Sequence, residues 1–383
     1  MLRLGALIPV CIALASGCGP NSNRDASAAL PPATAQDKPA ESEKPAPKAP
    51  EAAAAGDAAT PEVAEPDKPV APPAPVDPLA ALSADDGKIF LAGPTDGGEP
   101  LPNHYVKSNE RRHDTWFPYV KDLGGAFVGV GPDQCYTVAA AQGAELMFLL
   151  DIDHMVVDVH NNYEVLIEAS ETPEQLHQRF SAAEQDASVA LLEEAYTDVD
   201  DKTRRHRLQT YKASRETIFR HLKHVIARHQ GDEQTSWLSN ADHYKHIRTL
   251  FQNDRVRVMD GDLTGKDTMT SIGVATTKLE VPVRVLYLSN AEEYYKYTKQ
   301  YLANVAGLPG DDKSVVLRTI YNKEWEHADS LWNYQVQPLA NYQEFLSGGE
   351  VRSRNAMFRV ATKQKVLERT TDVPGLSRLG VSE

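Results

Sequence analysis

The chain has 383 residues, of which 41% are hydrophobic and 25% charged, and its formal net charge is −14 at pH 7. This acidic balance argues against nucleic acid as a partner and against a surface that binds anionic membranes as a whole, because such surfaces need an excess of cations. The three cysteines are Cys11, Cys18 and Cys135. Since the first two lie in the N-terminal segment, the sequence excludes a disulfide within the large C-terminal part.

Residues 1–18 have the pattern of a lipoprotein signal peptide. An apolar run over residues 4–15 follows Met-Leu-Arg, and the small residues Ser16 and Gly17 precede Cys18 in a lipobox arrangement. The run is too short to span a bilayer as a stable helix. We expect lipidation of Cys18, which would anchor an exported protein to the lipid bilayer of the cell envelope. The alternative is an ordinary secretory signal with an incidental cysteine.

Residues 19–84 are dominated by proline, alanine, glutamate, aspartate and lysine. Few side chains here could bury enough apolar surface to offset the loss of chain entropy. The sequence therefore predicts a disordered linker, which would hold the rest of the chain away from the membrane surface.

Residues 85–383 are predicted to fold as one α/β domain. Two short, continuous apolar runs, 126–130 and 146–150, have the composition of buried strands, and strand character returns at 256–259, 281–288 and 314–320. Continuous rather than alternating apolar runs are typical of parallel strands that are covered on both faces. Helical patterns separate these runs, so we predict a doubly wound, mostly parallel, Rossmann-like sheet.

Helical spacing between the strand runs supports this architecture. We expect helices at 136–143 and 156–167, a helical insertion over about 172–250, and one further helix over 291–305. The insertion opens with the cap sequence Thr172-Pro173, and its second half is an amphipathic helix with a cationic outer face. That face is either simply solvated or docks on anionic headgroups or envelope polyanions.

Glycines and carboxylates lie where the predicted strands end. Gly129 and Gly131 surround the end of the first strand, where the absence of a side chain lets backbone approach a ligand. Asp151 ends the second strand, the position from which a carboxylate accepts the ribose hydroxyls of a nucleotide-like cofactor. Asp262 follows the third strand and could reach an adenine amino group. The alternative is a doubly wound sheet whose turns simply need glycine.

Several motifs in one order resemble a bacterial protein family without an established activity, which is itself similar to class I S-adenosylmethionine-dependent methyltransferases in predicted fold. The motifs are Tyr105–Glu110, Gly125–Gln134, the apolar run into Asp151, Gly261–Gly265, Tyr287–Tyr294 and Leu308-Pro309 before Ser314. Together they span about residues 105–321, most of the predicted domain.

The resemblance implies a methyltransferase-like pocket with S-adenosylmethionine as the candidate cofactor. It implies cofactor-binding roles for Gly129, Gly131, Asp151 and Asp262, and it places Asn290 and Glu292 where such folds present groups to the reacting atom. Two residues depart from the family pattern: Cys135 follows the glutamine where asparagine is common, and Asp153 replaces the usual arginine. Asp153 therefore changes the charge beside the predicted cofactor residue Asp151 relative to the family pattern.

Other readings of the same region are weaker. Asp151 and Asp153 imitate the first motif of haloacid-dehalogenase-type phosphatases, but Met155 stands where that motif has threonine or valine. His154, Asp158 and His160 suggest metal ligands, although the two histidines do not share a helix face.

Two further features near the strand ends have competing explanations. Cys135 is a reactive thiol at a helix start or, more simply, a packed one. Residues 108–110 either fold over the pocket or form a plain turn.

Two functions remain open from the sequence. One is an envelope enzyme, or former enzyme, with a methyltransferase-like pocket. The other is a non-catalytic lipoprotein that binds an unknown small molecule or an envelope partner, because S-adenosylmethionine is made and kept in the cytoplasm.

Overall fold

The computed structural model describes residues 77–99 and 101–380. The predicted signal peptide, Cys18 and the linker up to residue 76 lie outside these residues. The chain is already packed at its first described residues, because Asn253 Nδ2 donates to the Leu79 carbonyl at 2.6 Å and Arg255 Nε donates to the Ala80 carbonyl at 2.7 Å. Contacts with the folded part therefore begin by Leu79, within the range that composition alone assigns to the linker.

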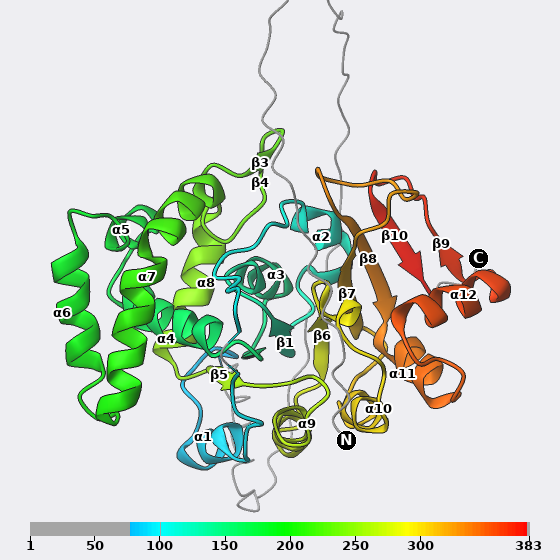
Figure 1. Ribbon diagram of the computed structural model, residues 1–383, viewed down its shortest axis with the longest axis horizontal. Coiled ribbons are helices and arrows are strands. Elements are labelled where there is room, and N and C mark those ends of the chain that lie inside the picture. The colour runs from blue at the N-terminus through cyan, green and yellow to red at the C-terminus, as the bar shows by residue number, and fades with distance from the viewer. Residues whose placement is uncertain (1–76, 100, 381–383) are drawn as a thin grey trace, which may run out of the picture. The chain divides into compact units, whose positions relative to one another are not determined.

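An eight-stranded sheet runs through the described part of the chain in the order β5-β2-β1-β6-β7-β8-β10-β9 (Figure 1). Its strands are β1 (Ala126–Val130), β2 (Leu146–Asp151), β5 (Val256–Asp260), β6 (Val283–Tyr287), β7 (Val315–Ile320), β8 (Asn333–Pro338), β9 (Leu367–Glu368) and β10 (Leu376–Leu379). The short strands β3 (His229–Gln230) and β4 (Glu233–Gln234) form a separate hairpin.

The first five strands in this order pair in parallel. By position in the chain they follow the order 3-2-1-4-5, which is shared with dinucleotide-binding α/β folds. β8 then runs antiparallel to β7, β10 lies parallel to β8, and β9 is antiparallel to β10. The prediction of a doubly wound, mostly parallel sheet is confirmed.

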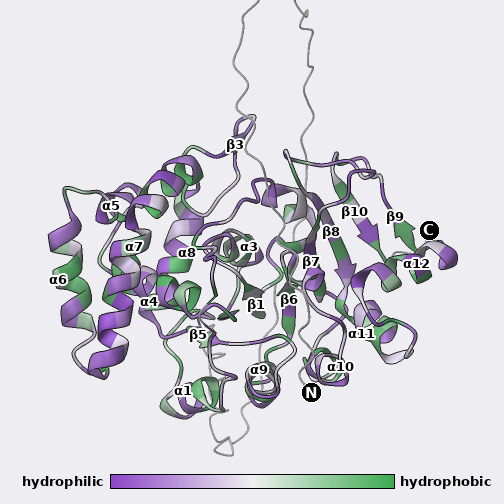
Figure 2. Ribbon diagram, viewed as in Figure 1, coloured by the Kyte–Doolittle hydropathy of each residue, from purple (hydrophilic) through white to green (hydrophobic). Residues whose placement is uncertain are grey.

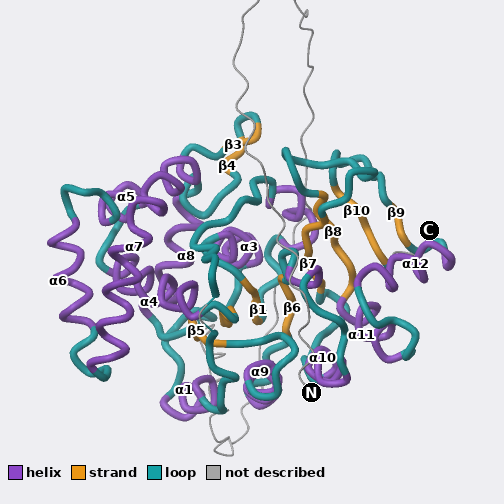
Figure 3. The backbone as a smooth tube through the Cα atoms, viewed as in Figure 1, coloured by secondary structure: helices purple, strands orange, loops and turns teal. Residues whose placement is uncertain are grey.

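Helices cover both faces of the sheet (Figures 1 and 3). One face packs against the short helix η1 (His113–Trp116) and against α2 (Phe117–Val120), α3 (Gln134–Gln142), α4 (His154–Glu168) and α8 (Ala241–Gln252). The insertion helices α5 (Pro173–Arg179), α6 (Gln185–Ala195) and α7 (Asp201–Ile226) pack against α4 on the same side. The other packs against α1 (Ala84–Leu91), α9 (Thr268–Lys278), α10 (Lys299–Ala306), α11 (Leu339–Ser347) and α12 (Arg354–Gln364).

The continuous apolar runs in the sequence follow from this double cover. Phe127 and Leu149 point into the core on the α3 and α4 side, whereas Val128 and Phe148 point into the core on the α9 side. Successive side chains of a strand face opposite sides of the sheet, so a strand that is buried on both sides has no polar face. Figure 2 shows the hydrophobic residues of β1 and β6 at the centre of the sheet.

The predicted helical insertion lies between α4 and β5. Thr172 Oγ1 accepts the N–H of Gln175 at 3.2 Å, and Gln175 Oε1 accepts the N–H of Glu171 at 2.7 Å, one residue before the position that a capping box predicts. α7 buries its apolar side, including Tyr211 and Leu222, as its periodicity predicts. Across residues 77–99 and 101–380, no helix is both long and apolar enough to cross a membrane.

The prediction of one continuous helix over 291–305 is wrong. The chain forms the short helix η2 (Ala291–Glu293), then extends, and α10 begins only at Lys299, where Thr298 Oγ1 caps the N–H of Tyr301 at 3.1 Å. The tertiary contacts of Glu292 and Tyr297, whose hydroxyl donates to the Glu292 carboxylate, hold both residues in the core. These contacts outweigh local helix propensity.

Candidate functional site

The parallel strands β1 and β2 bring two of the predicted site residues close together. Gly131 follows β1 with φ +90°, and Asp151 is the last residue of β2. The backbone of Gly131 lies near enough to the Asp151 carboxylate to lower its pKa. Asp260, the last residue of β5, lies opposite Asp151 in the β2–β5 ladder. Since β1 and β6 lie side by side, Gly131 and Asp151 are next to the point where the strand order reverses, the usual ligand position in such sheets.

Asp151 is mostly buried, and burial raises the pKa of its carboxyl group from the ordinary 3.8 to about 6. The N–H of Asp153 donates to Asp151 Oδ1 at 2.9 Å, and this bond and the Gly131 N–H oppose the shift. The side chain is therefore largely ionised at neutral pH in surroundings that disfavour its charge.

Different structural constraints explain why glycine occupies positions 129 and 131 near the end of β1. A side chain at Gly131 would be strained at its positive φ and would place its Cβ 2.5 Å from Gln134 Nε2. Gly129 lies within the strand, where a Cβ would approach the Phe127 ring to 2.5 Å and Cys135 Sγ to 3.1 Å. Packing explains the glycine at 129, whereas the turn itself requires Gly131.

Cys135 is a packed thiol. It is fully buried, its Sγ donates to the Val130 carbonyl at 3.4 Å, and burial raises its pKa well above the ordinary value. Such a thiol is protonated at neutral pH and is not a nucleophile. The structure therefore favours the simpler of the two sequence interpretations.

Asp262, in the turn after β5, and Asp133, in the turn after β1, both form hydrogen bonds with protein groups. Asp262 Oδ1 accepts the Thr264 N–H at 2.7 Å in the turn after β5. Asp133, directly after the glycine turn, lies 2.8 Å from His221 Nε2 and accepts the Trp237 indole N–H at 3.3 Å. Asp133 thereby ties the start of α3 to the insertion.

A covering segment, residues 94–99 and 101–112, contacts the carboxyl ends of the strands. Near its start, Asp96 accepts the N–H groups of Asp267 and Thr268 at 2.8 and 3.2 Å, at the first turn of α9. The N–H of Glu99 donates to the Ile152 carbonyl at 2.8 Å, just beyond β2.

Further along the covering segment, His104 Nδ1 lies 2.8 Å from Asp153 Oδ2. Asp153 also caps α4 by accepting the Met155 N–H at 3.0 Å. The segment therefore lies against the chain on both sides of Asp151.

Glu110 holds the other end of the covering segment. Its carboxylate accepts hydrogen bonds from Ser289 Oγ at 2.6 Å, from Thr319 Oγ1 at 2.8 Å and from the hydroxyl of Tyr287. Burial would raise its pKa, but the hydrogen bond and charge of His113, with the hydroxyl donors, keep the pKa below the ordinary value. Residues 108–110 thus lie over the ends of β6 and β7 and do more than form a turn.

The two predicted catalytic residues follow β6 and contact other groups. Asn290 is half-buried, and its Nδ2 lies 3.4 Å from the Tyr294 hydroxyl. Glu292 is buried with Arg318, whose Nε donates to Glu292 Oε2 at 2.6 Å, while the Tyr342 hydroxyl donates to Oε1 at 2.8 Å. The catalytic role of Glu292 stays a prediction, and these contacts explain the residue as a partner of a buried cation.

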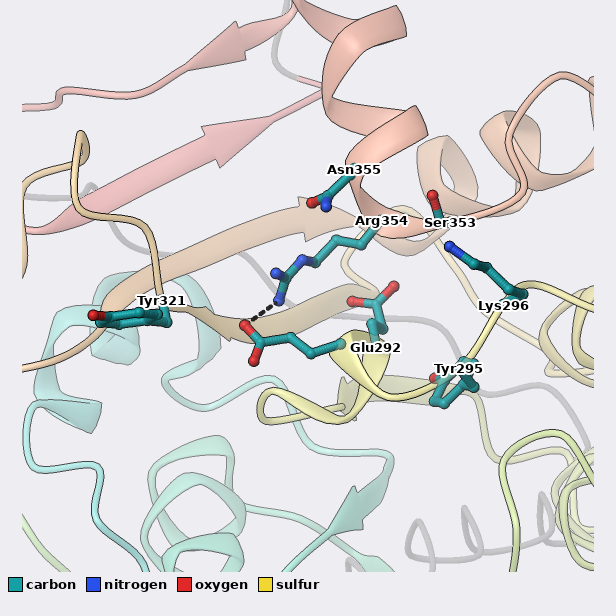
Figure 4. A pocket seen from close by; sticks show the side chains of 8 residues that line it. Glu292, Tyr295, Lys296, Tyr321, Ser353, Arg354 and Asn355 are labelled. Carbon is teal, nitrogen blue, oxygen red and sulfur yellow. Dashed lines mark hydrogen bonds and ion pairs between the residues drawn. The ribbon is translucent and has the colours of Figure 1, made fainter. Parts of the chain in front are cut away.

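A cavity of about 290 Å³ adjoins this acidic group at the carboxyl ends of β6 and β7 (Figure 4). Its lining is Glu292, Glu293, Tyr295, Lys296, Tyr321, Ser353, Arg354 and Asn355. Arg354 Nη1 donates to Glu293 Oε1 at 2.9 Å in this cavity. Gly131 and Asp151 do not line it.

The histidines near Asp151 are arranged differently from the sequence prediction. His160 is buried, its Nδ1 lies 2.6 Å from the Tyr136 hydroxyl and its Nε2 lies 2.9 Å from the Gly131 carbonyl, so it does not join His154. His206, from the insertion helix α7, joins His154 and Asp158 instead. Spacing within α4 indicates two of these three residues, since His154 and Asp158 are four residues apart. The third, His206, comes from α7, and its position depends on helix packing.

The family profile of a domain of unknown function (DUF7790) matches residues 105–380. The chain belongs to this family. No curated protein matches the chain. Among solved structures, the chain is similar to the rRNA methyltransferase AviRa from Streptomyces viridochromogenes, with 10% identity over 66% of this chain and 90% of that chain. The TM-score of 0.26 is too low for this likeness to bear on function.

We predict that Glu292→Gln lowers the free energy of unfolding by about 3–5 kcal/mol, because it leaves the buried Arg318 without its anion. Urea unfolding of both proteins measures this difference. Glu368→Gln is the control, since its pair with Arg378 is half exposed and contributes less than about 1 kcal/mol. Equal small losses in the two variants would contradict the structural role.

Proposed function

We propose that this protein is an envelope lipoprotein, anchored through acylated Cys18, whose domain binds a nucleoside-type small molecule at the carboxyl edge of its sheet. The observation that carries the binding proposal is the desolvated Asp151 carboxylate beside Gly131. Ionisable side chains whose pKa is strongly shifted by burial cluster at ligand-binding and catalytic sites. A carboxylate at this strand end can accept both hydroxyls of a ribose, and the motif order of the sequence supports the same ligand class.

The proposal commits to binding rather than to methyl transfer. S-adenosylmethionine, its product S-adenosylhomocysteine and adenosine share the ribose that Asp151 would recognise. The haloacid-dehalogenase alternative is not favoured, because the Asp153 carboxylate already caps α4 and contacts His104, whereas that chemistry needs it as a free acid or base.

Asp151→Asn should weaken binding of these nucleosides by about ten- to a hundredfold, the value of one charge-assisted hydrogen bond. Calorimetric titration of the full-length protein with each nucleoside measures the affinity. The absence of binding by folded wild-type protein would reject the ligand class, and unchanged affinity in the variant would reject the role of Asp151.

The same substitution should stabilise the fold at neutral pH. The pKa of Asp151 is raised in the folded state, so its ionisation destabilises the fold above about pH 6, and this cost disappears as the pH falls toward 4. We expect Asp151→Asn to raise the free energy of unfolding by about 1–3 kcal/mol at pH 7.5 and by much less at pH 4. Denaturant unfolding at the two pH values is the measurement.

Glu164 provides a matched control for both experiments. Burial raises its pKa to about 7, but it lies within α4, away from the carboxyl edge. Glu164→Gln should therefore stabilise the protein at pH 7.5 and leave the nucleoside affinity unchanged. Stabilisation by Glu164→Gln alone would show that Asp151 is not a strained charge.

Cys18→Ser tests the anchor separately. The variant cannot be acylated at residue 18, so it should move from the membrane fraction to the soluble fraction when expressed with its own signal. Fractionation followed by immunoblotting measures the distribution. Retention of the variant in the membrane fraction would overturn the lipoprotein assignment without affecting the binding proposal.

A further inference from the structure

The side chains of His154, Asp158 and His206 converge where α4 and α7 pack together. His154 and Asp158 are four residues apart on α4, so they share one face of the helix. His206 comes from α7, and its Nδ1 is hydrogen-bonded to Asp158 Oδ2. One ligand atom from each of the three residues lies within 4.8 Å of the other two.

We infer that these three residues form a binding site for a divalent transition metal of the Zn²⁺ type. Two imidazoles and one carboxylate are ligands that Zn²⁺ prefers, at bond lengths of about 2.0–2.2 Å. A tetrahedral site would bring the ligand atoms to about 3.3 Å from one another, and small rotations of the two partly exposed imidazoles achieve this. The Asp158 carboxylate is buried and provides a fixed point for the ion.

Neighbouring side chains orient the cluster and give it a charge that favours a bound cation. His154 Nδ1 lies 2.6 Å from Asp260 Oδ1, which fixes the ring so that Nε2 faces Asp158 at 3.9 Å. A histidine ligand that donates its other N–H to a carboxylate is the common outer-shell arrangement of zinc sites. The carboxylates of Asp158 and Asp260 outnumber the neighbouring cation Arg207, whose Nε is 3.7 Å from Asp158 Oδ1, and this excess of negative charge favours a bound cation.

The covering segment packs directly against this arrangement. A Cβ at Gly98 would lie 2.3 Å from Asp260 Oδ1 and 2.8 Å from His154 Cβ, so only glycine leaves the pair undisturbed. On the other side, the His154 and His206 side chains are 38% and 47% exposed. Three protein ligands with one open side leave a coordination position for water or for an exogenous ligand.

Titration of the full-length, untagged protein with Zn²⁺ against a chromogenic chelator, and with Co²⁺ by visible absorption, tests the site. We expect one equivalent of Zn²⁺ to bind and Co²⁺ to give the spectrum of a four-coordinate complex, whereas Mg²⁺ should not compete. His206→Ala and Asp158→Asn should each weaken Zn²⁺ binding by more than about 100-fold, and Asp260→Ala by about 10- to 100-fold.

The control is His224→Ala, which removes another exposed histidine from the same helix and should leave the affinity unchanged. Circular dichroism of each variant establishes that it is folded, and His206 is exposed enough for its replacement to be tolerated. Equal Zn²⁺ affinity of wild-type and His206→Ala proteins, or no binding by folded wild-type protein, would overturn the inference.

Discussion

The buried carboxylate of Glu110 determines how the N-terminal part of the domain meets the sheet. An isolated carboxylate in this position would be strongly destabilising, but it accepts hydrogen bonds from Ser289 and Thr319 at two strand ends, and His113 lies 3.1 Å away. Because these donors come from β6, β7 and η1, one charge fixes three segments together. The covering segment depends on this attachment at one end and on Asp96 at the other.

Between these two attachments the carboxyl edge of the sheet concentrates acidic groups. Asp151 and Asp260 end adjacent parallel strands, and Asp153 follows directly. Parallel strands place such groups side by side, and each needs a hydrogen-bond donor or a cation. His104 approaches Asp153, and His154 approaches Asp260. Burial of Asp151 raises the pKa of its carboxyl group to about 6, and nearby backbone groups such as the Asp153 N–H oppose this shift only in part.

The sequence predicts β1 and β2 well because burial on both faces leaves a continuous apolar run, whereas β5 shows weaker strand character, with alternating burial at the edge of the sheet. It does not predict β8, whose Gln335 and Gln337 are buried polar side chains that both accept hydrogen bonds from Arg318. A strand with such residues resembles a surface segment until its partners are known. The same ion-pair group draws Glu292 into the core and breaks the helix expected after β6.

In the candidate site, the sequence predicts which residues lie at the strand ends. It does not predict which side chains meet between packed helices. Asp151 and Gly131 meet because of the parallel topology, which the sequence pattern contains. His206 reaches Asp158 only because α7 packs on α4, and no spacing along the chain contains that information. Asn290 and Glu292 follow the fourth parallel strand as expected, yet their side chains contact other protein groups.

The position of the helical insertion has a consequence for how the chain folds. Met147 of β2 pairs with Val256 of β5, so α4 to α8 must all be accommodated before two adjacent strands can meet. The entropy of closing a loop rises only with the logarithm of its length, and helices form locally and fast. We therefore expect β1, α3 and β2 to associate early. β5 would dock late and leave the outer edge of β2 open to mispairing until the insertion helices have collapsed.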